Sequence, residues 1–382
     1  MQTKKPGYIL VLTLMILSIS AIVVTQIFYQ GRLFNAFVPL IIEKEKARQI
    51  ALAGIPIAIA QLSLQDAYFT KEQDKEQKES ARADQKETDQ KKPPKPTAKD
   101  ITAHAKGMLK TLLTIQGRWQ KFALTYEADG IDAQLALCIT CEDGKLNLNN
   151  LYDFKKHAFA KAPHMSIPDI FKTFAEASKK FTKNKNMFET IEETLKKRDD
   201  PLFDVTQVLD PIVLDMFRDY FFYVPADNPF AAQDQEAKKT EQMMPRVFLA
   251  DIFTVDTSSA DIKINPWVLS PSLKKILGFT SKEIANEDSF KKEMEEFVEK
   301  VKIDDISWKK DWDTYLKPLY GVDFQSLPKD IAPFLSIKFE PRLFSVLCYS
   351  KVGRVLQKLL VILERNATET GESILVRKFY WL

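Results

Sequence analysis

The sequence predicts an α+β protein in which one antiparallel sheet is interrupted by a large helical domain. Apolar residues alternate on both sides of an Asp-Gly turn at 129–130, which indicates a β-hairpin. A long stretch with apolar residues three and four apart follows, and the strand pattern returns from about residue 336. Because strand patterns flank the helical pattern, we expect a single sheet with a helical domain inserted between its strands.

The composition excludes several classes of protein. In 382 residues, 55 Lys+Arg stand against 52 Asp+Glu, and a net charge of +3 gives no strong field for a nucleic acid. Three Cys do not make a disulfide scaffold. The sequence contains no phosphate-binding glycine loop, no G-x-S-x-G elbow and no H-E-x-x-H. His104, His157 and His164 show no spacing typical of a hydrolase, so we predict that the chain is not an enzyme.

The N-terminus contains a candidate membrane span. From Pro6 to Gly31 there is no charged side chain, and a helix of about 20 residues crosses the hydrocarbon core. Lys4 and Lys5 precede the span and Arg32 follows it, which predicts a cytoplasmic N-terminus and a C-terminal domain outside the cytoplasm. A secretory signal has a shorter apolar core and a small-residue cleavage site. A plain uncleaved anchor stays open as an alternative.

The helical pattern continues beyond the span. A helix that is apolar all round at first and amphipathic later is typical of a span that continues into a globular head, so we expect one helix over 8–66. Pro39 and Pro56 should bend or interrupt it. The apolar residues expected on one side are Phe34, Val38, Ile41, Ala47, Ile50, Ala51, Ile57 and Ala58.

Residues 71–100 are highly charged and contain nothing apolar larger than Ala, and we expect a disordered linker over 67–100. A short helix and the hairpin make up 101–150, the first part of the α+β domain. Leu124 and Tyr126 alternate before the turn of the hairpin. After the turn, the alternating residues are Leu135, Leu137 and Ile139.

The predicted helical domain spans 151–335, and antiparallel strands over 336–382, with a turn at Thr370-Gly371, complete the sheet. Helical spacing recurs at 169–181, 187–197, 208–222, 270–279 and 281–301. The candidate N-caps are Ser166, Asp210, Ser270 and Ser281. Residues 228–245 are predicted to form a loop.

A short basic leader precedes the span. Lys4-Lys5-Pro6-Gly7, followed by Tyr8, resembles the leader of type IV pilins and pseudopilins, which prepilin peptidase cleaves after the Gly. This resemblance implies that Gly7 is the last leader residue. It also implies that Tyr8 becomes the new, methylated N-terminus.

Further motifs resemble the general secretion pathway protein K family, the minor pseudopilins of type II secretion systems. They are KARQIALAGIPIAIAQL at 46–62, ITCEDGKLNLNNL at 139–151, KINPWVL at 263–269 and the closing strands. The resemblance implies a pilin-like fold, with the long N-terminal helix packed on the sheet. It also implies a single-pass inner-membrane protein at the tip of the pseudopilus, acting in pseudopilus assembly and in protein export across the outer membrane. The implied partners are other minor pseudopilins, the major pseudopilin, prepilin peptidase, the inner-membrane secretion platform and membrane lipid.

The residue at Leu12 departs from the pattern of most pilins. Their fifth mature residue is a Glu that pairs with the N-terminal amine of a neighbouring subunit, whereas counting from Tyr8 gives Leu12 here. A carboxylate in an apolar segment is costly unless it is paired. A subunit at the tip has no other subunit ahead of it to supply an amine, so Leu12 fits the tip position. Leu12 is equally compatible with an ordinary lipid-facing leucine.

No metal site or cofactor is predicted from the residues. Many members of the family carry a D-W-I-D-x-D stretch associated with calcium, and this sequence has only Arg198-Asp199-Asp200-Pro201 near that place. Calcium is therefore implied by the resemblance alone, without identifiable ligands. Cys138 and Cys141 form a C-x-x-C, but residues three apart in a strand point to opposite faces. We expect core cysteines, as for Cys348, with a disulfide or a metal as alternatives.

Two aromatic groups, Trp308/Trp312 and Phe379/Tyr380/Trp381, are expected to pack, or to anchor a partner if exposed. Asn366-Ala367-Thr368 matches a glycosylation acceptor by pattern alone. Two other functions stay open: a minor pilin of a type IV pilus, and a single-pass, membrane-anchored periplasmic binding protein.

Overall fold

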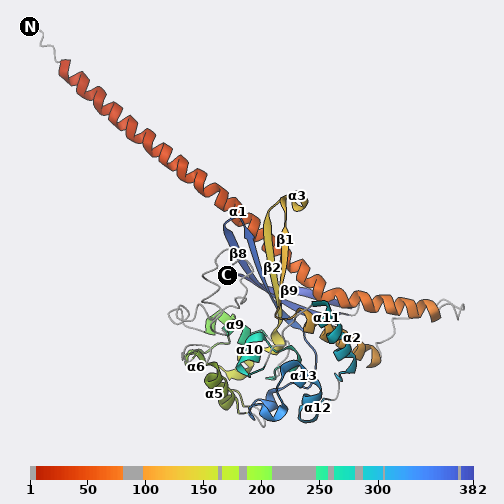
Figure 1. Ribbon diagram of the computed structural model, residues 1–382. Helices are drawn as coiled ribbons and strands as arrows, with labels where there is room; N and C mark the ends of the chain where they lie inside the picture. Colours follow the sequence, from red (N-terminus) through yellow and green to blue (C-terminus); the bar gives the residue numbers. More distant parts are fainter. Residues whose placement is uncertain are drawn as a thin grey trace, which may run out of the picture.

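A long N-terminal helix, an antiparallel sheet and an inserted helical block make up the structure, a computed structural model (Figure 1). The sheet has five strands in the order β1-β2-β7-β8-β9, and the helical block lies between β2 and β7 in the sequence. This confirms the predicted α+β class. The structure describes residues 6–80, 98–161, 166–179, 187–208, 247–256, 262–279, 287–303, 306–368 and 371–382.

The strands of the sheet are antiparallel throughout. The predicted hairpin is confirmed, although Tyr126 lies in a one-turn helix, α3 (Tyr126–Asp129), which ends at Gly130 with a φ of 72°. The predicted C-terminal strands are confirmed as well, while Thr370 of the expected turn lies outside the described residues. The bounds are Trp119–Leu124 for β1, Ala133–Cys141 for β2, Leu343–Val352 for β7, Val355–Thr368 for β8 and Gly371–Trp381 for β9.

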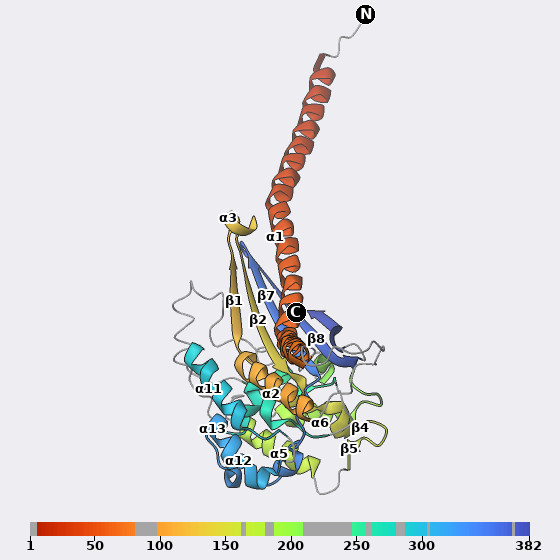
Figure 2. The same ribbon diagram turned by 90° about the vertical axis from the view of Figure 1, so that its right-hand side faces the viewer.

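Small residues let helix α1 (Pro6–Ser80) lie close to one face of the sheet (Figure 2). Ala47, Ala51 and Ala58 are fully buried, and Gly54 lies on the same stripe of the helix. The buried hydroxyl of Ser350 in β7 donates to the carbonyl oxygen of Ala47 at 2.5 Å. The expected amphipathic second half of the helix is therefore present, and it forms part of the core.

Helix α1 is bent and not interrupted. Pro39 and Pro56 lie inside it, and it changes direction along its length (Figures 1 and 2), as expected where a proline removes a backbone hydrogen bond. The helix continues to Ser80, beyond the expected end at 66 and into the segment expected to be a linker. The next helix, α2 (Ala98–Ile115), begins within that segment, whose residues 81–97 lie outside the described part.

The inserted block is mainly helical. Ser166 and Ser270 are the N-caps of α5 and α10, and the Ser270 hydroxyl accepts from the Leu273 amide at 3.3 Å. The predicted caps Asp210 and Ser281, the helix at 209–222 and the loop at 228–245 lie outside the described residues. Its larger helices are α5 (Ile167–Ser178), α6 (Met187–Lys196), α10 (Pro271–Ile276), α11 (Glu287–Lys300) and α12 (Trp308–Tyr315). Single turns form α4 (Leu148–Leu151), α9 (Leu249–Ile252) and α13 (Lys317–Tyr320).

Four short strands in this block were not predicted from the sequence. They form two pairs of two residues each, too short to leave an alternating pattern. The pairs are β3 (Leu146–Asn147) with β6 (Phe253–Thr254), which is parallel, and β4 (Tyr152–Asp153) with β5 (Ala158–Phe159), which is antiparallel.

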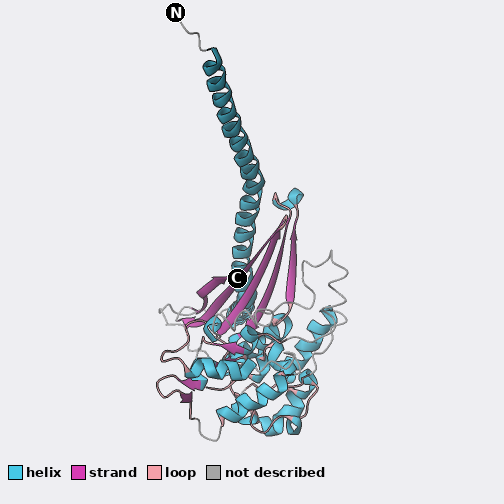
Figure 3. Cartoon of the chain, turned by 90° about the vertical axis from the view of Figure 1, so that its left-hand side faces the viewer, coloured by secondary structure: helices cyan, strands magenta, loops and turns pink. Residues whose placement is uncertain are grey.

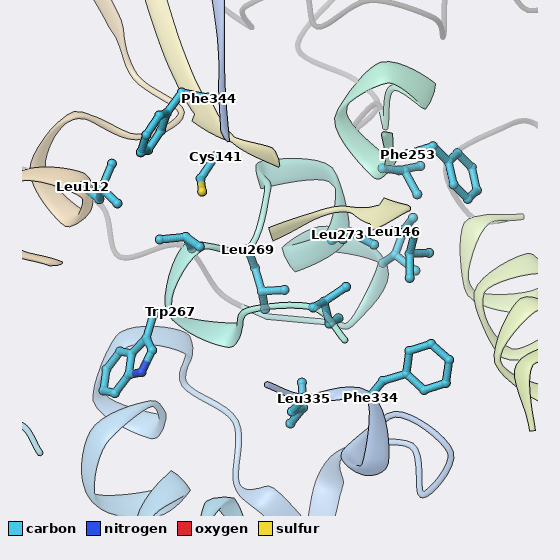
Figure 4. Packing of buried hydrophobic residues seen from close by; sticks show 14 of the residues in the cluster. Leu112, Cys141, Leu146, Phe253, Trp267, Leu269, Leu273, Phe334, Leu335 and Phe344 are labelled. Atoms are coloured by element: carbon cyan, nitrogen blue, oxygen red, sulfur yellow. The ribbon is translucent and has the colours of Figure 1, made fainter. Parts of the chain in front are cut away.

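One hydrophobic core joins the sheet to the inserted block. Phe344 of β7 and Leu112 of α2 belong to the same buried cluster as Trp267 and Phe334 of the block (Figure 4). A core shared in this way holds the block against one end of the sheet (Figure 3).

Candidate functional site

The first half of α1 forms an exposed apolar surface that stands clear of the head (Figure 3). By length and composition it is able to cross a membrane: the helix at Val11–Ser63 contains an 18-residue window of mean hydropathy 2.3, none of it buried. The exposed large side chains on it include Val11, Leu14, Met15, Ile16, Leu17, Ile19, Ile22, Ile27 and Phe28. Such a surface needs lipid or other apolar helices around it.

Two hydroxyl groups on this apolar half are satisfied by the helix itself. Ser18 donates to the carbonyl oxygen of Leu14 at 2.9 Å, and Thr25 donates to that of Ala21 at 2.7 Å. A hydroxyl bonded in this way leaves no unpaired donor in a hydrocarbon environment. Ser18 and Thr25 are therefore compatible with a membrane.

The predicted processing residues lie at the start of α1. Gly7 and Tyr8 are in its first turns, and the basic residues Lys4 and Lys5 lie outside the described part. Leu12 is 45% exposed on the helix surface. Its side chain is available to a neighbouring helix or to lipid.

Two of the sequence motifs lie directly against each other at the junction of the sheet with the inserted block. A Cβ atom at Gly144 would be 1.7 Å from the carbonyl oxygen of Val268, so only glycine fits there. The Asn265 amide donates to the Asp143 carbonyl oxygen at 2.8 Å, and the Ser270 amide donates to that of Gly144 at 3.3 Å. The motifs at 139–151 and 263–269 therefore form one joint.

Asparagine side chains of the first motif hold neighbouring loops. Asn147 Nδ2 donates to the Asp256 carbonyl oxygen at 2.9 Å. Asn149 Nδ2 donates to the carbonyl oxygens of Leu202 and Val255 at 2.8 and 3.0 Å, and its Oδ1 accepts from the Leu202 amide at 2.8 Å. The side chains fix two separate backbone segments, at residue 202 and at residues 255–256, so the motif has a structural role in this chain.

Lys145 is the buried charge at the centre of this joint, only 5% exposed. Its Nζ donates to Glu142 Oε1 at 2.5 Å, to the Ala250 carbonyl oxygen at 3.0 Å and to Ser345 Oγ at 3.1 Å. These acceptors match the three protons of an ammonium group. Lys145 therefore acts as a clamp that ties the turn at 142–144, directly after β2, to α9 and β7.

A second buried acid lies close to this clamp. Asp251 is 4% exposed, and its Oδ2 accepts from the Ser272 amide at 2.7 Å. Burial raises the pKa of Asp251, and the charge of Lys145 partly opposes that rise. A cavity of about 40 Å³ beside these groups has room for a few waters. We detect no group of three metal-ligating side chains in the described ranges.

The cysteines are core residues, as expected. Cys138 and Cys141 are free, and they lie in different hydrophobic clusters on opposite faces of β2. Cys348 is free as well, and burial raises its pKa to about 12. Burial also raises the pKa of Cys138 and Cys141, so none of the three thiols is activated.

The histidines and acids singled out in the sequence are not brought together in one site. His104 Nε2 lies 2.8 Å from Arg365 on β8, and His157 pairs with the exposed Asp199 at 3.3 Å. His164 lies outside the described residues. Within the described part of the chain, His104 and His157 therefore have separate partners and do not share a site.

The aromatic residues divide into a packed and an exposed group. Trp308 and Trp312 are buried, and their indole nitrogens donate to the carbonyl oxygens of Ser336 and Val322 at 2.7 and 2.8 Å. On β9, Tyr380 and Trp381 are partly buried and pack against hydrophobic clusters, whereas Phe379 is 55% exposed. Packing is therefore confirmed for the tryptophan pair and for Tyr380 and Trp381.

Sequence analysis did not identify the Lys145 clamp. The available signal was the order Glu142-Asp143-Gly144-Lys145, which places several charges directly after the apolar strand β2. Charged residues at the end of a buried strand are either solvated or paired. The partners Ala250 and Ser345 are remote in sequence, so only the fold could show that Lys145 is paired and not solvated.

No protein-family model and no curated relative matches this chain. A solved structure described as "The Crystal Structure of the GspK-GspI-GspJ complex from enterotoxigenic Escherichia coli Type 2 Secretion System" is similar to it. The identity is 12% and the TM-score 0.35, over 74% of this chain and 94% of the matched chain. We therefore infer the function from the residues of the chain itself.

Proposed function

We propose that the chain is a minor pseudopilin of a type II secretion system, anchored in the inner membrane and assembled at the tip of a periplasmic pseudopilus. The observation that carries this proposal is the division of α1 into two halves. One half exposes apolar side chains all round, and the other is locked into the sheet through Ala47, Ala51 and Ala58. One helix thus serves both as a membrane anchor and as the spine of the head.

The exposed half of α1 is the surface that we assign to assembly. In lipid it is solvated by acyl chains, and outside lipid it needs apolar partners. Helices of other minor pseudopilins and of the major pseudopilin would supply them once the subunit leaves the membrane. Phe34, Phe37 and Ile41 continue the apolar surface beyond Arg32, and all three belong to the part that would contact such helices.

Maturation at Gly7 is part of the proposal. Prepilin peptidase would cleave after Gly7, and the inner-membrane secretion platform would extract the mature chain beginning at Tyr8. The support is the order of basic residues, glycine and apolar run at the start of α1. Leu12 supports a position with no subunit ahead, because it has no carboxylate to pair with a neighbour's amine.

The experiment deletes the gene for this chain in its native organism and measures where exported proteins accumulate. A tip pseudopilin predicts accumulation in the periplasm, with recovery when the intact gene is restored. Normal export with loss of surface pili would indicate the type IV pilus alternative. Normal export and normal pili would contradict both assembly functions and favour a simple anchored protein.

A further inference from the structure

A groove of about 750 Å³ lies beside β1, which is an edge strand of the sheet. Figure 2 shows β1 at the edge of the sheet, with α2 and α11 close to one end of it. The residues that line the groove are Gln61, Thr111, Thr114, Ile115, Arg118, Trp119, Gln120, Lys121, Phe122 and Lys291. They come from α1, α2, β1 and α11, so the groove depends on the folded head.

The charges in the groove have one sign. Arg118, Lys121 and Lys291 line it, and none of the lining residues, all within the described ranges, is acidic. The Arg118 guanidinium lies 4.0 Å from the centre of the Phe290 ring, which holds it at the groove. The nearby acid Glu295 is bound to Lys110 at 2.5 Å. The groove is therefore complementary to a negatively charged ligand.

The backbone of β1 is a template for a further strand. β1 is an edge strand, and its six residues pair with β2 in an unbroken register. An edge strand of this kind directs a row of backbone donors and acceptors away from the sheet. Both faces of β1 are also fixed, because the Trp119 ring lies 4.9 Å from that of Tyr349 and Gln120 Nε2 donates to Gln61 Oε1 at 3.0 Å.

The opposite end strand, β9, lacks these properties. Its register with β8 shifts between Ile362 and Leu363, and such an irregularity twists an edge away from further pairing. The two edges of the sheet are therefore not equivalent.

We propose that the β1 groove binds an extended acidic segment of a partner protein, which adds to β1 as a sixth strand. Backbone hydrogen bonds along β1 would supply affinity, as in other cases of strand addition. Lys121, Arg118 and Lys291 would select carboxylates and repel basic segments. The inference does not depend on the proposed secretion function, because the groove is a property of the head alone.

The test measures binding of a labelled peptide to the full chain in detergent by fluorescence anisotropy. The probe is a nine-residue peptide in which Val and Glu alternate, and the control peptide carries Lys in place of Glu. The acidic peptide should bind, with an affinity that falls as salt is added, and the basic peptide should not. Absence of binding by the acidic peptide would overturn the proposal.

Charge reversal locates the site. Lys121→Glu combined with Lys291→Glu removes two exposed cations and should weaken binding about 10-fold or more. The matched control is Lys309→Glu combined with Lys310→Glu on α12, which changes the net charge equally away from the groove. Equal weakening by both pairs would show a general charge effect and would contradict the site.

Strand addition is separated from charge attraction by methylating the backbone of the probe. Two peptides are made, each with alternate amide nitrogens methylated, in the two possible patterns. A strand directs only one alternate set of amides toward its neighbour, so one pattern should abolish binding and the other should preserve it. Equal binding of the two patterns, whether retained or lost, would contradict a strand added to β1.

Discussion

Gly54 of α1 lies directly against Cys348 of β7: a Cβ atom at Gly54 would be 2.6 Å from the Cys348 Sγ. The pair marks a close approach of the helix to the sheet, and Ala51 and Ala58 on the same stripe are fully buried. This contact explains the small residues of the motif at 46–62. They set the distance between helix and sheet, on which the position of the head relative to the membrane anchor depends.

Enlarging Gly54 should destabilise the head. Gly54→Ala places a methyl group on a buried thiol, with an expected loss of about 1 to 3 kcal/mol, although alanine favours a helix elsewhere. Adding Cys348→Ala removes the Sγ and should recover about 1 kcal/mol in a double-mutant cycle. Thermal unfolding of the four variants measures the coupling. Gly31→Ala is the control, because its Cβ would have no atom within 4 Å. If the losses in the free energy of unfolding at 54 and 348 are additive, the contact between Gly54 and Cys348 does not restrict the size of the residue at 54.

Gly144→Ala should disrupt the joint between the sheet and the inserted block. The added Cβ would meet the Val268 carbonyl oxygen at 1.7 Å, and this oxygen belongs to the backbone and cannot rotate away, so we expect a loss above about 3 kcal/mol in the free energy of unfolding. Gly130→Ala is the matched control: its φ is 72° but nothing lies within 4 Å, and it should cost only about 1 to 2 kcal/mol. Limited proteolysis of the block measures the difference, and equal resistance in the two variants would contradict the tight joint.

Stability should fall as pH rises because of Asp251. Burial raises the pKa of Asp251 above its ordinary value of 3.8, so the folded chain holds this proton more tightly than the unfolded chain does. The resulting stabilisation is complete below 3.8 and is lost as pH rises through the higher folded pKa. Asp251→Asn keeps an acceptor for the Ser272 amide and should remove this part of the pH dependence.

Melting temperatures from about pH 4 to about pH 8 test this assignment. Glu127→Gln on the exposed helix α3 is the control and should leave the curve unchanged. A curve for Asp251→Asn that is identical to that of the unmodified chain would show that another group titrates.

Leu12→Glu should reduce assembly of the subunit into the pseudopilus. It places a carboxylate in the apolar segment at a cost of about 2.5 to 3.5 kcal/mol, and a tip subunit has no neighbour ahead to supply an amine. Leu12→Ile keeps the apolar character and should assemble normally. Crosslinking to the other minor pseudopilins, followed by blotting, measures the assembled fraction. Normal assembly of Leu12→Glu would indicate an available amine and would contradict the tip position.

Local patterns were sufficient to predict the architecture. Alternation around the turn at 129–130 and the strand-like apolar segments at the C-terminus identified the five strands of the sheet, because each strand carries its own local pattern. The two-residue strands β3 and β6 were not predictable, since their pairing of Leu146 with Phe253 depends on tertiary contacts. The start of the predicted linker is the end of α1, where many residues with good helix propensity, such as Glu, Lys and Gln, extend the helix to Ser80.

The candidate sites also divide into those that local sequence can identify and those that depend on the fold. Gly7, Tyr8 and Leu12 could be chosen from the sequence because a leader and a span are read along the chain. The Lys145 clamp could not, because its acceptors Ala250 and Ser345 come from distant segments. The β1 groove was missed for the same reason, since four separate elements line it.

The N-terminus of the chain isolated from its native membrane tests the central claim most directly. Intact-mass and N-terminal fragment mass spectrometry should find a chain that begins at Tyr8 with a methyl group on its α-amine. Gly7→Leu should block cleavage and leave the leader attached. A wild-type chain that still begins at Met1, with an unmodified Tyr8, would contradict a pseudopilin and identify α1 as a plain membrane anchor.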